Sequence, residues 1–129
     1  MRYFVSTTAI LLFACTLVTA AEHTKDTPEV VKQKLKAKTA ILVDVREVEE
    51  WNEGHLDAAI LWQLSDINDG PSMGDLKAKF GDKEIVYLHC RSGGRVLLAA
   101  EKLKDKGYDI RPLKPGYEAL LKAGFKKAE

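Results

Sequence analysis

The part of this sequence best suited to chemistry is a cysteine followed by a short turn with two glycines and two arginines. Cys90 follows the apolar run Ile85–Leu88 and His89, and the turn after it reads Arg91-Ser92-Gly93-Gly94-Arg95. Two glycines allow the unusual dihedral angles that point backbone N–H groups inward around an anion. Two guanidinium groups match the oxygens of a doubly charged tetrahedral substrate. We therefore predict a nucleophilic cysteine in an anion-binding loop.

The competing interpretation of Cys90 is structural, because a single cysteine at the end of a core strand is most often a small buried hydrophobe. The neighbouring glycines and arginines favour the reactive interpretation, since a structural thiol gains nothing from them. The helix predicted after the turn adds the positive end of its dipole. A thiol in such a place is ionised more often than that of a free cysteine, which makes it a better nucleophile.

Short apolar runs alternate with helical patterns along the chain, which indicates an α/β fold with a parallel sheet. The predicted strands are Ala40–Val45, Ala58–Trp62, Ile85–Leu88 and Ile110–Leu113. Helices are predicted from Thr27-Pro28-Glu29 onward, over Glu47–Glu53, along the apolar repeat Val96, Ala99, Ala100 and Leu103, and over Tyr117–Lys122. Because Pro112 has no N–H for a ladder, the last strand is expected at an edge of the sheet.

One segment lacks a clear pattern. Ser65–Asp75 is predicted to be irregular, because Gly70, Pro71 and Gly74 interrupt any helix there. The following stretch, Leu76–Phe80, is expected to be at most a short helix. The two tryptophans, Trp51 and Trp62, are assigned to the core.

The first 21 residues differ from the rest of the chain. Arg2 is their only charged side chain, residues 4–18 are largely apolar, and small residues at 18–21 offer a cleavage site. We predict a secretory signal peptide at 1–21, one domain at 22–129 and a periplasmic location. An uncleaved membrane anchor is the alternative, because the apolar run is almost long enough to span a bilayer. Cleavage would remove Cys15 and leave Cys90 as the only thiol, so that no intramolecular disulfide could form.

The charge balance gives no support for a polyanionic partner. The chain has a formal net charge of +1, and removing Arg2 with the signal peptide takes it to 0. A neutral chain argues against nucleic acid or an anionic membrane surface as partner. We expect a monomer that acts on small molecules and does not bind the membrane once the signal peptide has been cleaved.

The histidines are scattered along the chain, so we predict no metal site. His89 precedes the cysteine, but neighbouring strand residues point to opposite faces, which favours a packed histidine over a Cys–His pair. His55 follows a helix end and is predicted to be a hydrogen-bonded structural residue, whereas His23 falls in a segment expected to be flexible. Asp44 and Arg46 are expected to form an ion pair that fixes the end of a strand.

Three groups of residues match one family pattern in their order and spacing. They are Asp44-Val45-Arg46 with Glu50-Trp51 and Gly54-His55-Leu56, then Cys90-Arg91-Ser92-Gly93-Gly94-Arg95, and finally Gly107-Tyr108 with Leu113 and Gly116. On these segments, which span about Pro28 to Gly124, the chain resembles the rhodanese domain family, and especially its single-domain exported thiosulfate sulfurtransferases.

The resemblance implies a single rhodanese-like domain with a central parallel sheet of about five strands, flanked by helices. The strand patterns number four, so a fifth strand is expected before Pro28. Two positions depart from the family pattern: Ala58 stands in place of a glycine, and Pro115 in place of the first of two glycines. Both concern local turns outside the loop that carries the cysteine.

The resemblance also implies a reaction. In the family, the cysteine takes a sulfane sulfur from thiosulfate and holds it as a persulfide, which then passes to cyanide or a thiol. Carried over, Cys90 is the catalytic nucleophile. The substrate-binding loop is then Arg91, Ser92, Gly93, Gly94 and Arg95. Neither a cofactor nor a metal is expected.

Two other functions remain open. A cysteine phosphatase or arsenate reductase also begins its loop with His-Cys, but that loop places five residues between cysteine and arginine. Here four residues separate Cys90 from Arg95, and Val96 stands at the position of the phosphatase arginine. The second alternative is an exported sulfur carrier or persulfide-binding module that works only with a partner protein.

Overall fold

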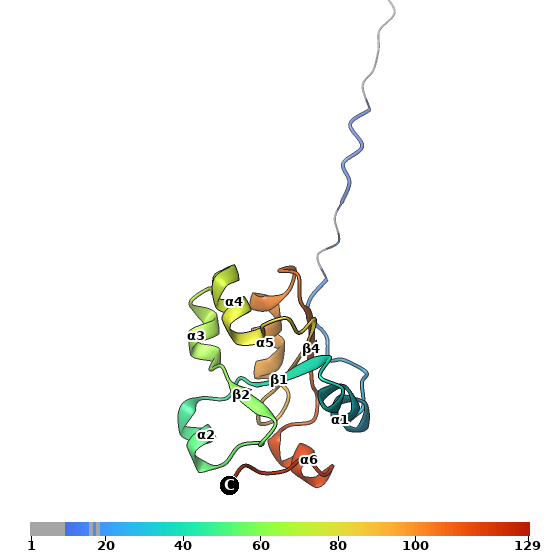
Figure 1. Ribbon diagram of the computed structural model, residues 1–129. Helices are drawn as coiled ribbons and strands as arrows, with labels where there is room; N and C mark the ends of the chain where they lie inside the picture. The colour runs from blue at the N-terminus through green and yellow to red at the C-terminus, as the bar shows by residue number, and fades with distance from the viewer. Residues whose placement is uncertain (1–9, 16, 18) are drawn as a thin grey trace, which may run out of the picture.

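Four parallel strands form the centre of the molecule (Figure 1). The computed structural model describes residues 10–15, 17 and 19–129. The strands, in the spatial order β2-β1-β3-β4, are β1 (Ala40–Asp44), β2 (Ala59–Leu61), β3 (Ile85–His89) and β4 (Asp109–Pro112). The predicted α/β fold with a parallel sheet is confirmed, and β4 lies at an edge as its proline requires.

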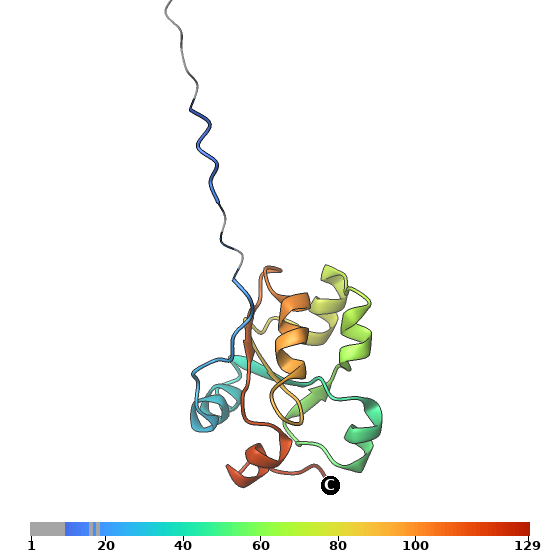
Figure 2. The same cartoon turned by 180° about the vertical axis from the view of Figure 1, so that it is seen from behind.

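Helices cover both faces of this sheet (Figures 1 and 2). They are α1 (Pro28–Lys36), α2 (Val48–Glu53), α3 (Leu64–Asn68), α4 (Met73–Phe80), α5 (Arg95–Leu103) and α6 (Tyr117–Lys122). Side chains of α3, α4 and α5 pack in one hydrophobic cluster and those of α1 and α6 in the other. Along β1, Ala40 and Leu42 face the second cluster while Val43 faces the first, as the alternation of side chains along a strand requires.

The fifth strand expected before Pro28 is not found among the residues that the structure describes. The segment there makes a single backbone hydrogen bond with the sheet, from the Thr24 N–H to the Pro112 carbonyl oxygen at 2.8 Å. Pro112 has no N–H with which to continue a ladder. Three residues later the Thr27 side chain caps α1, so the chain has already turned away from the edge of the sheet.

The prediction of an irregular segment over Ser65–Asp75 is wrong, because α3 and α4 occupy most of it. Gly74 lies inside α4, in its first turn. Ser72 and Asp75 form a reciprocal capping box, in which each side chain accepts a hydrogen bond from the backbone N–H of the other. This cap offsets the low helix propensity of Gly74.

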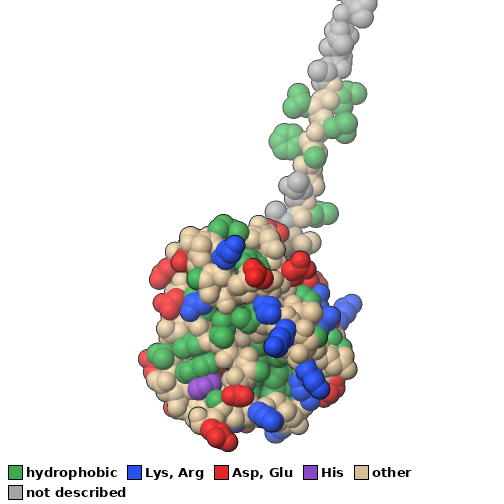
Figure 3. Space-filling model, viewed as in Figure 1, with side chains coloured by type: hydrophobic (Ala, Val, Ile, Leu, Met, Phe, Trp, Pro, Cys, Tyr) green, Lys and Arg blue, Asp and Glu red, His purple; other side chains and the backbone are tan. Residues whose placement is uncertain are grey.

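The predicted signal peptide stays a prediction. Residues 1–9, 16 and 18 lie outside the described part of the chain, and residues 10–15 run away from the domain (Figure 1). No helix in the described part is both long and apolar enough to cross a membrane. Over the face shown in Figure 3, acidic and basic side chains are mixed, in keeping with the small net charge.

A polar cluster is buried where the central strands end. His89 and Asp44 are both fully buried, and Arg46 is 4% exposed. His89 Nε2 lies 3.6 Å from Asp44 Oδ2, which confirms a packed histidine on the sheet. Burial lowers the pKa of His89 from 6.5 to about 4, and the positive charge of Arg46 acts in the same direction, whereas Asp44 opposes the shift. The imidazole of the folded protein is therefore neutral at pH 7.

This burial predicts a pH dependence of folding. Because the pKa of His89 is lower in the folded state, the unfolded chain binds the proton first, and stability is lost as the pH falls from 6.5 towards 4. The shift corresponds to about 3 kcal/mol. We expect His89→Leu to remove this part of the acid sensitivity. Between pH 7 and pH 4 the variant should therefore lose about 3 kcal/mol less of its unfolding free energy than the wild type loses. Denaturant unfolding across this range measures it, and parallel curves for the two proteins would contradict the prediction.

Candidate active site

Cys90 is the first residue after β3 and lies at the floor of the cysteine loop (residues 90–95). Its side chain and backbone together are 1% exposed, while Arg91, Ser92 and Gly94 are exposed. The Gly93 N–H donates a hydrogen bond to the Cys90 Sγ at 3.2 Å. The expected inward-facing amide is thus present, and it belongs to a glycine with a φ of +86°, in the left-handed region that favours glycine.

The start of α6 packs against the backbone of this loop. The Tyr117 N–H donates to the Cys90 carbonyl oxygen at 2.9 Å. A Cβ atom added to Gly116 would lie 1.7 Å from the Arg91 carbonyl oxygen, far inside contact distance. Only a glycine allows the two backbones to come this close. The shape of the cysteine loop therefore depends on a residue more than twenty positions further along the chain.

Arg95, at the other end of the loop, is held by α2. Its guanidinium group pairs with the Glu50 carboxylate through two contacts, Nη1 to Oε1 at 2.5 Å and Nη2 to Oε2 at 2.9 Å. The hydrogen bonds from Arg95 lower the pKa of Glu50 from 4.5 to about 2, although partial burial opposes the shift. The pair therefore remains charged at neutral pH, and Arg95 fastens the loop and the first turn of α5 to α2.

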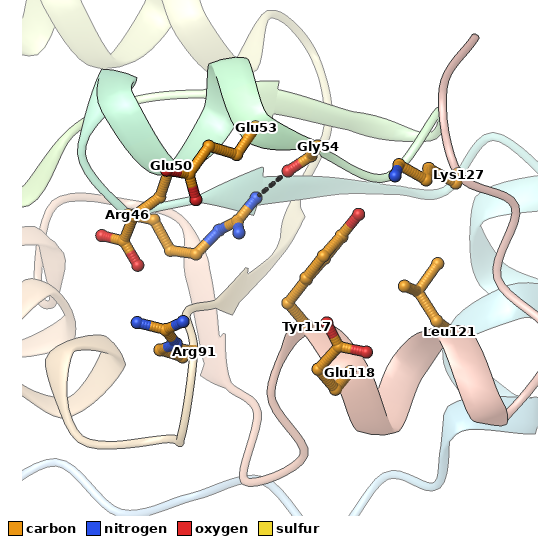
Figure 4. A pocket seen from close by; sticks show the side chains of 9 residues that line it. All are labelled: Arg46, Glu50, Glu53, Gly54, Arg91, Tyr117, Glu118, Leu121 and Lys127. Carbon is orange, nitrogen blue, oxygen red and sulfur yellow. Dashed lines mark hydrogen bonds between the residues drawn. The ribbon is translucent and has the colours of Figure 1, made fainter.

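Arg91 is placed differently. It is exposed, and its guanidinium group makes no ion pair or hydrogen bond with any residue that the structure describes. It lines an open cavity of about 320 Å³ between the cysteine loop, α2, α6 and the C-terminal segment (Figure 4). The other lining residues are Arg46, Glu50, Glu53, Gly54, Tyr117, Glu118, Leu121 and Lys127. The cavity borders the loop that carries Cys90.

The wall of this cavity is built on the predicted ion pair between Asp44 and Arg46, which the structure confirms. Arg46 Nη2 lies 2.8 Å from Asp44 Oδ2 and also donates to the Gly54 carbonyl oxygen at 2.7 Å. The guanidinium group stacks over the Tyr117 ring, 4.2 Å from its centroid. Arg46 therefore joins the end of β1 to α2 and α6, and its charge is largely balanced by Asp44.

A family model described as the rhodanese-like domain matches residues 27–123. That span contains the whole sheet, the contacts of the cysteine loop with α2 and α6, and every residue that lines the cavity except Lys127. The chain belongs to the rhodanese-like domain family.

The chain is similar to parts of two longer proteins and to one solved rhodanese-like domain protein. A tRNA uridine(34) hydroxylase of Chlamydia trachomatis is 29% identical over 101 residues, which are 77% of this chain and 31% of the hydroxylase. A tRNA sulfurtransferase of Desulfurococcus amylolyticus is 35% identical over 88 residues, 68% of this chain and 16% of that protein. The crystal structure of a rhodanese-like domain protein from Staphylococcus aureus has a TM-score of 0.60 at 30% identity, covering 77% of this chain and 92% of that one. The chain thus spans about a third of the hydroxylase and less of the sulfurtransferase.

The cysteine loop lies at the end of β3, as the sequence predicts, but its surroundings differ from the prediction. Arg91 and Arg95 were expected to act together, whereas Arg95 pairs with Glu50. The prediction that Trp51 lies in the core is wrong, because Trp51 is only partly buried and stacks on His55, with ring centroids 3.6 Å apart. His55 is hydrogen-bonded as predicted, through its Nδ1 to the Trp51 carbonyl oxygen. Among the described residues no group of three or more His, Cys, Asp or Glu side chains is arranged to hold a metal ion.

The close approach at Gly116 gives a direct test of how the loop is shaped. We expect Gly116→Ala to force the start of α6 away from the Arg91 carbonyl, with a loss of about 1–3 kcal/mol in the free energy of unfolding. Gly94→Ala is the matched control, because a Cβ atom there meets nothing within 4 Å and its φ of −87° suits any residue. The control should stay within about 0.5 kcal/mol of the wild type. Equal stabilities of the two variants in denaturant unfolding would show that the packing is not tight.

Proposed function

We propose that this protein is a sulfurtransferase that carries a sulfane sulfur on Cys90 as a persulfide. The observation that carries the proposal is a cysteine at the end of β3 whose sulfur accepts a hydrogen bond from a loop amide, with an exposed arginine next to it. The relative named a tRNA sulfurtransferase supports the same chemistry. Export by a signal peptide and a periplasmic location remain part of the proposal.

The reaction we propose is a double displacement. The Cys90 thiolate attacks the outer sulfur of thiosulfate, the sulfur–sulfur bond of the donor breaks, and sulfite leaves with the electron pair. The outer sulfur now forms the persulfide anion on Cys90. A thiolate or cyanide then attacks this sulfur, takes it as a persulfide or thiocyanate, and regenerates the thiolate. No net redox change or proton transfer to a histidine is needed, in keeping with a neutral His89 turned towards Asp44.

The loop offers separate groups for the two charged partners of this reaction. Arg91 is exposed beside the cavity, so it is the arginine that we assign to the sulfonate oxygens of thiosulfate and to the departing sulfite. The Gly93 N–H, 3.2 Å from the sulfur, is assigned to the sulfur anion. Arg95 is bound by Glu50 and is assigned to holding the loop.

The persulfide intermediate can be detected by its mass. Incubation with thiosulfate should add one sulfur atom, about 32 Da, to the wild-type protein and none to Cys90→Ser. Mass spectrometry of the intact protein measures this and also fixes the N-terminus of the mature chain. Cyanide or a small thiol should then remove the added mass. A persulfide that forms once and is never discharged by small molecules would favour the sulfur-carrier alternative, and no mass increase would contradict the proposal.

The role assigned to Arg91 can be tested by substitution. Arg91→Ala should raise the KM for thiosulfate about tenfold or more, because a charged hydrogen bond to the anionic donor is lost. Its melting temperature should stay near that of the wild type, since Arg91 is exposed and unpaired in the described structure. Arg91→Lys should recover part of the affinity through charge alone. Steady-state kinetics with thiosulfate and cyanide measure the effect, and an unchanged KM in Arg91→Ala would remove Arg91 from the site.

A further inference from the structure

A histidine from outside the family match touches the cysteine loop. His23 Nε2 lies 2.6 Å from the Gly93 carbonyl oxygen. His23 belongs to the N-terminal strap (residues 21–26), which runs beside the β4 edge of the sheet (Figure 2). The sequence predicts flexibility for this segment, and in the structure the strap makes defined contacts with the domain. Because a carbonyl oxygen only accepts, the His23 ring must carry its proton on Nε2 in this contact.

The strap has its own anchors, so His23 is held in place independently of the loop. The Thr24 N–H donates to the Pro112 carbonyl oxygen at 2.8 Å. The Asp26 carboxylate accepts hydrogen bonds from the Tyr87 hydroxyl at 2.6 Å and from Arg111 Nη1 at 2.8 Å. These contacts fix the backbone on the C-terminal side of His23 and leave its ring over the loop.

The residue that His23 contacts is also the one that binds the sulfur. The Gly93 N–H points at the Cys90 Sγ, and the Gly93 carbonyl points at His23. A Cβ atom on Gly93 would lie 2.6 Å from the Lys114 carbonyl oxygen and 3.4 Å from His23 Nε2. Gly93 is therefore enclosed between the sulfur on one side and His23 with Lys114 on the other.

The geometry of a peptide bond transmits this contact to the sulfur. In a trans peptide the C=O and the N–H point in opposite directions. Holding the Gly93 carbonyl towards His23 therefore turns the Gly94 N–H the other way, into the loop. A persulfide extends one sulfur atom beyond Sγ, so it needs a second amide further along the loop than that of Gly93.

We propose that His23 is a positioning residue for sulfur transfer, which fixes the orientation of the Gly93–Gly94 peptide so that the loop amides meet the persulfide sulfur. The inference rests on the proposed function, since it concerns the same intermediate. His23 touches neither donor nor acceptor in this assignment and acts through the loop backbone. Its effect is therefore on the rate of sulfur transfer and not on the affinity for thiosulfate.

The test compares three variants of the full chain. His23→Leu removes the hydrogen bond, and His23→Gln keeps a donor at about the reach of Nε2. Tyr87→Phe is the matched control, because it removes one hydrogen bond to Asp26 without touching Gly93, while Arg111 and the Pro112 carbonyl oxygen still hold the strap. For each protein the rate of persulfide formation and discharge, the KM for thiosulfate, the melting temperature and the amide resonances of Gly93 and Gly94 are measured.

His23→Leu should form and discharge the persulfide about threefold to tenfold more slowly, the range set by losing one hydrogen bond, with KM nearly unchanged. Its Gly93 and Gly94 amide resonances should move, whereas His23→Gln should recover most of the rate and both resonances. Tyr87→Phe should keep the wild-type rate even where its melting temperature falls. Wild-type rate and resonances in His23→Leu, or equal losses of rate in His23→Leu and Tyr87→Phe, would overturn the inference. Failure of the wild type to form a persulfide would instead overturn the proposed function, and the amide resonances would still report on the contact.

Discussion

The interaction on which the site depends is the contact between the start of α6 and the backbone of the cysteine loop. The Tyr117 N–H binds the Cys90 carbonyl, and Gly116 lies against the Arg91 carbonyl more closely than any other residue type would permit. With these carbonyl groups turned towards α6, the loop backbone is free to direct an amide at the sulfur on its other side. Remote segments thus impose a loop conformation that the short sequence of the loop would not hold alone.

The other anchors act at different points of the same loop. Glu50 on α2 binds Arg95, the first residue of α5, and His23 on the strap binds the Gly93 carbonyl. Each anchor comes from a different part of the chain, so the site depends on the packing of the whole domain for its shape. The buried cluster of His89, Asp44 and Arg46 extends this support, because Arg46 also ties the end of β1 to the Gly54 carbonyl.

These anchors explain what could be predicted from the sequence and what could not. The order of strands and helices, the helix cap at Thr27 and the position of Cys90 at the end of β3 follow from local patterns, and these agree with the structure. Helix α3 and the first turn of α4 were missed, and in α4 the capping box at Ser72 outweighs the signals of the nearby glycines and proline. The partners Glu50 and His23 lie 45 and 70 residues from their contacts in the loop, and no local pattern reports such distances.

The two arginines of the loop show how position in the fold decides the role of a residue type. Arg95 begins α5 and faces α2, where the Glu50 carboxylate binds two of its N–H donors and balances its charge. Arg91 lies in the exposed turn directly after the cysteine and opens onto the cavity with no partner in the described structure. A single arginine balances only part of the charge of the dianionic donor that we propose, which leaves a part of the stabilisation to the loop amides. The orientation of the peptides between Cys90 and Arg95 is therefore as much a part of the site as the charged side chains, and this is why the anchors of the backbone matter to the chemistry.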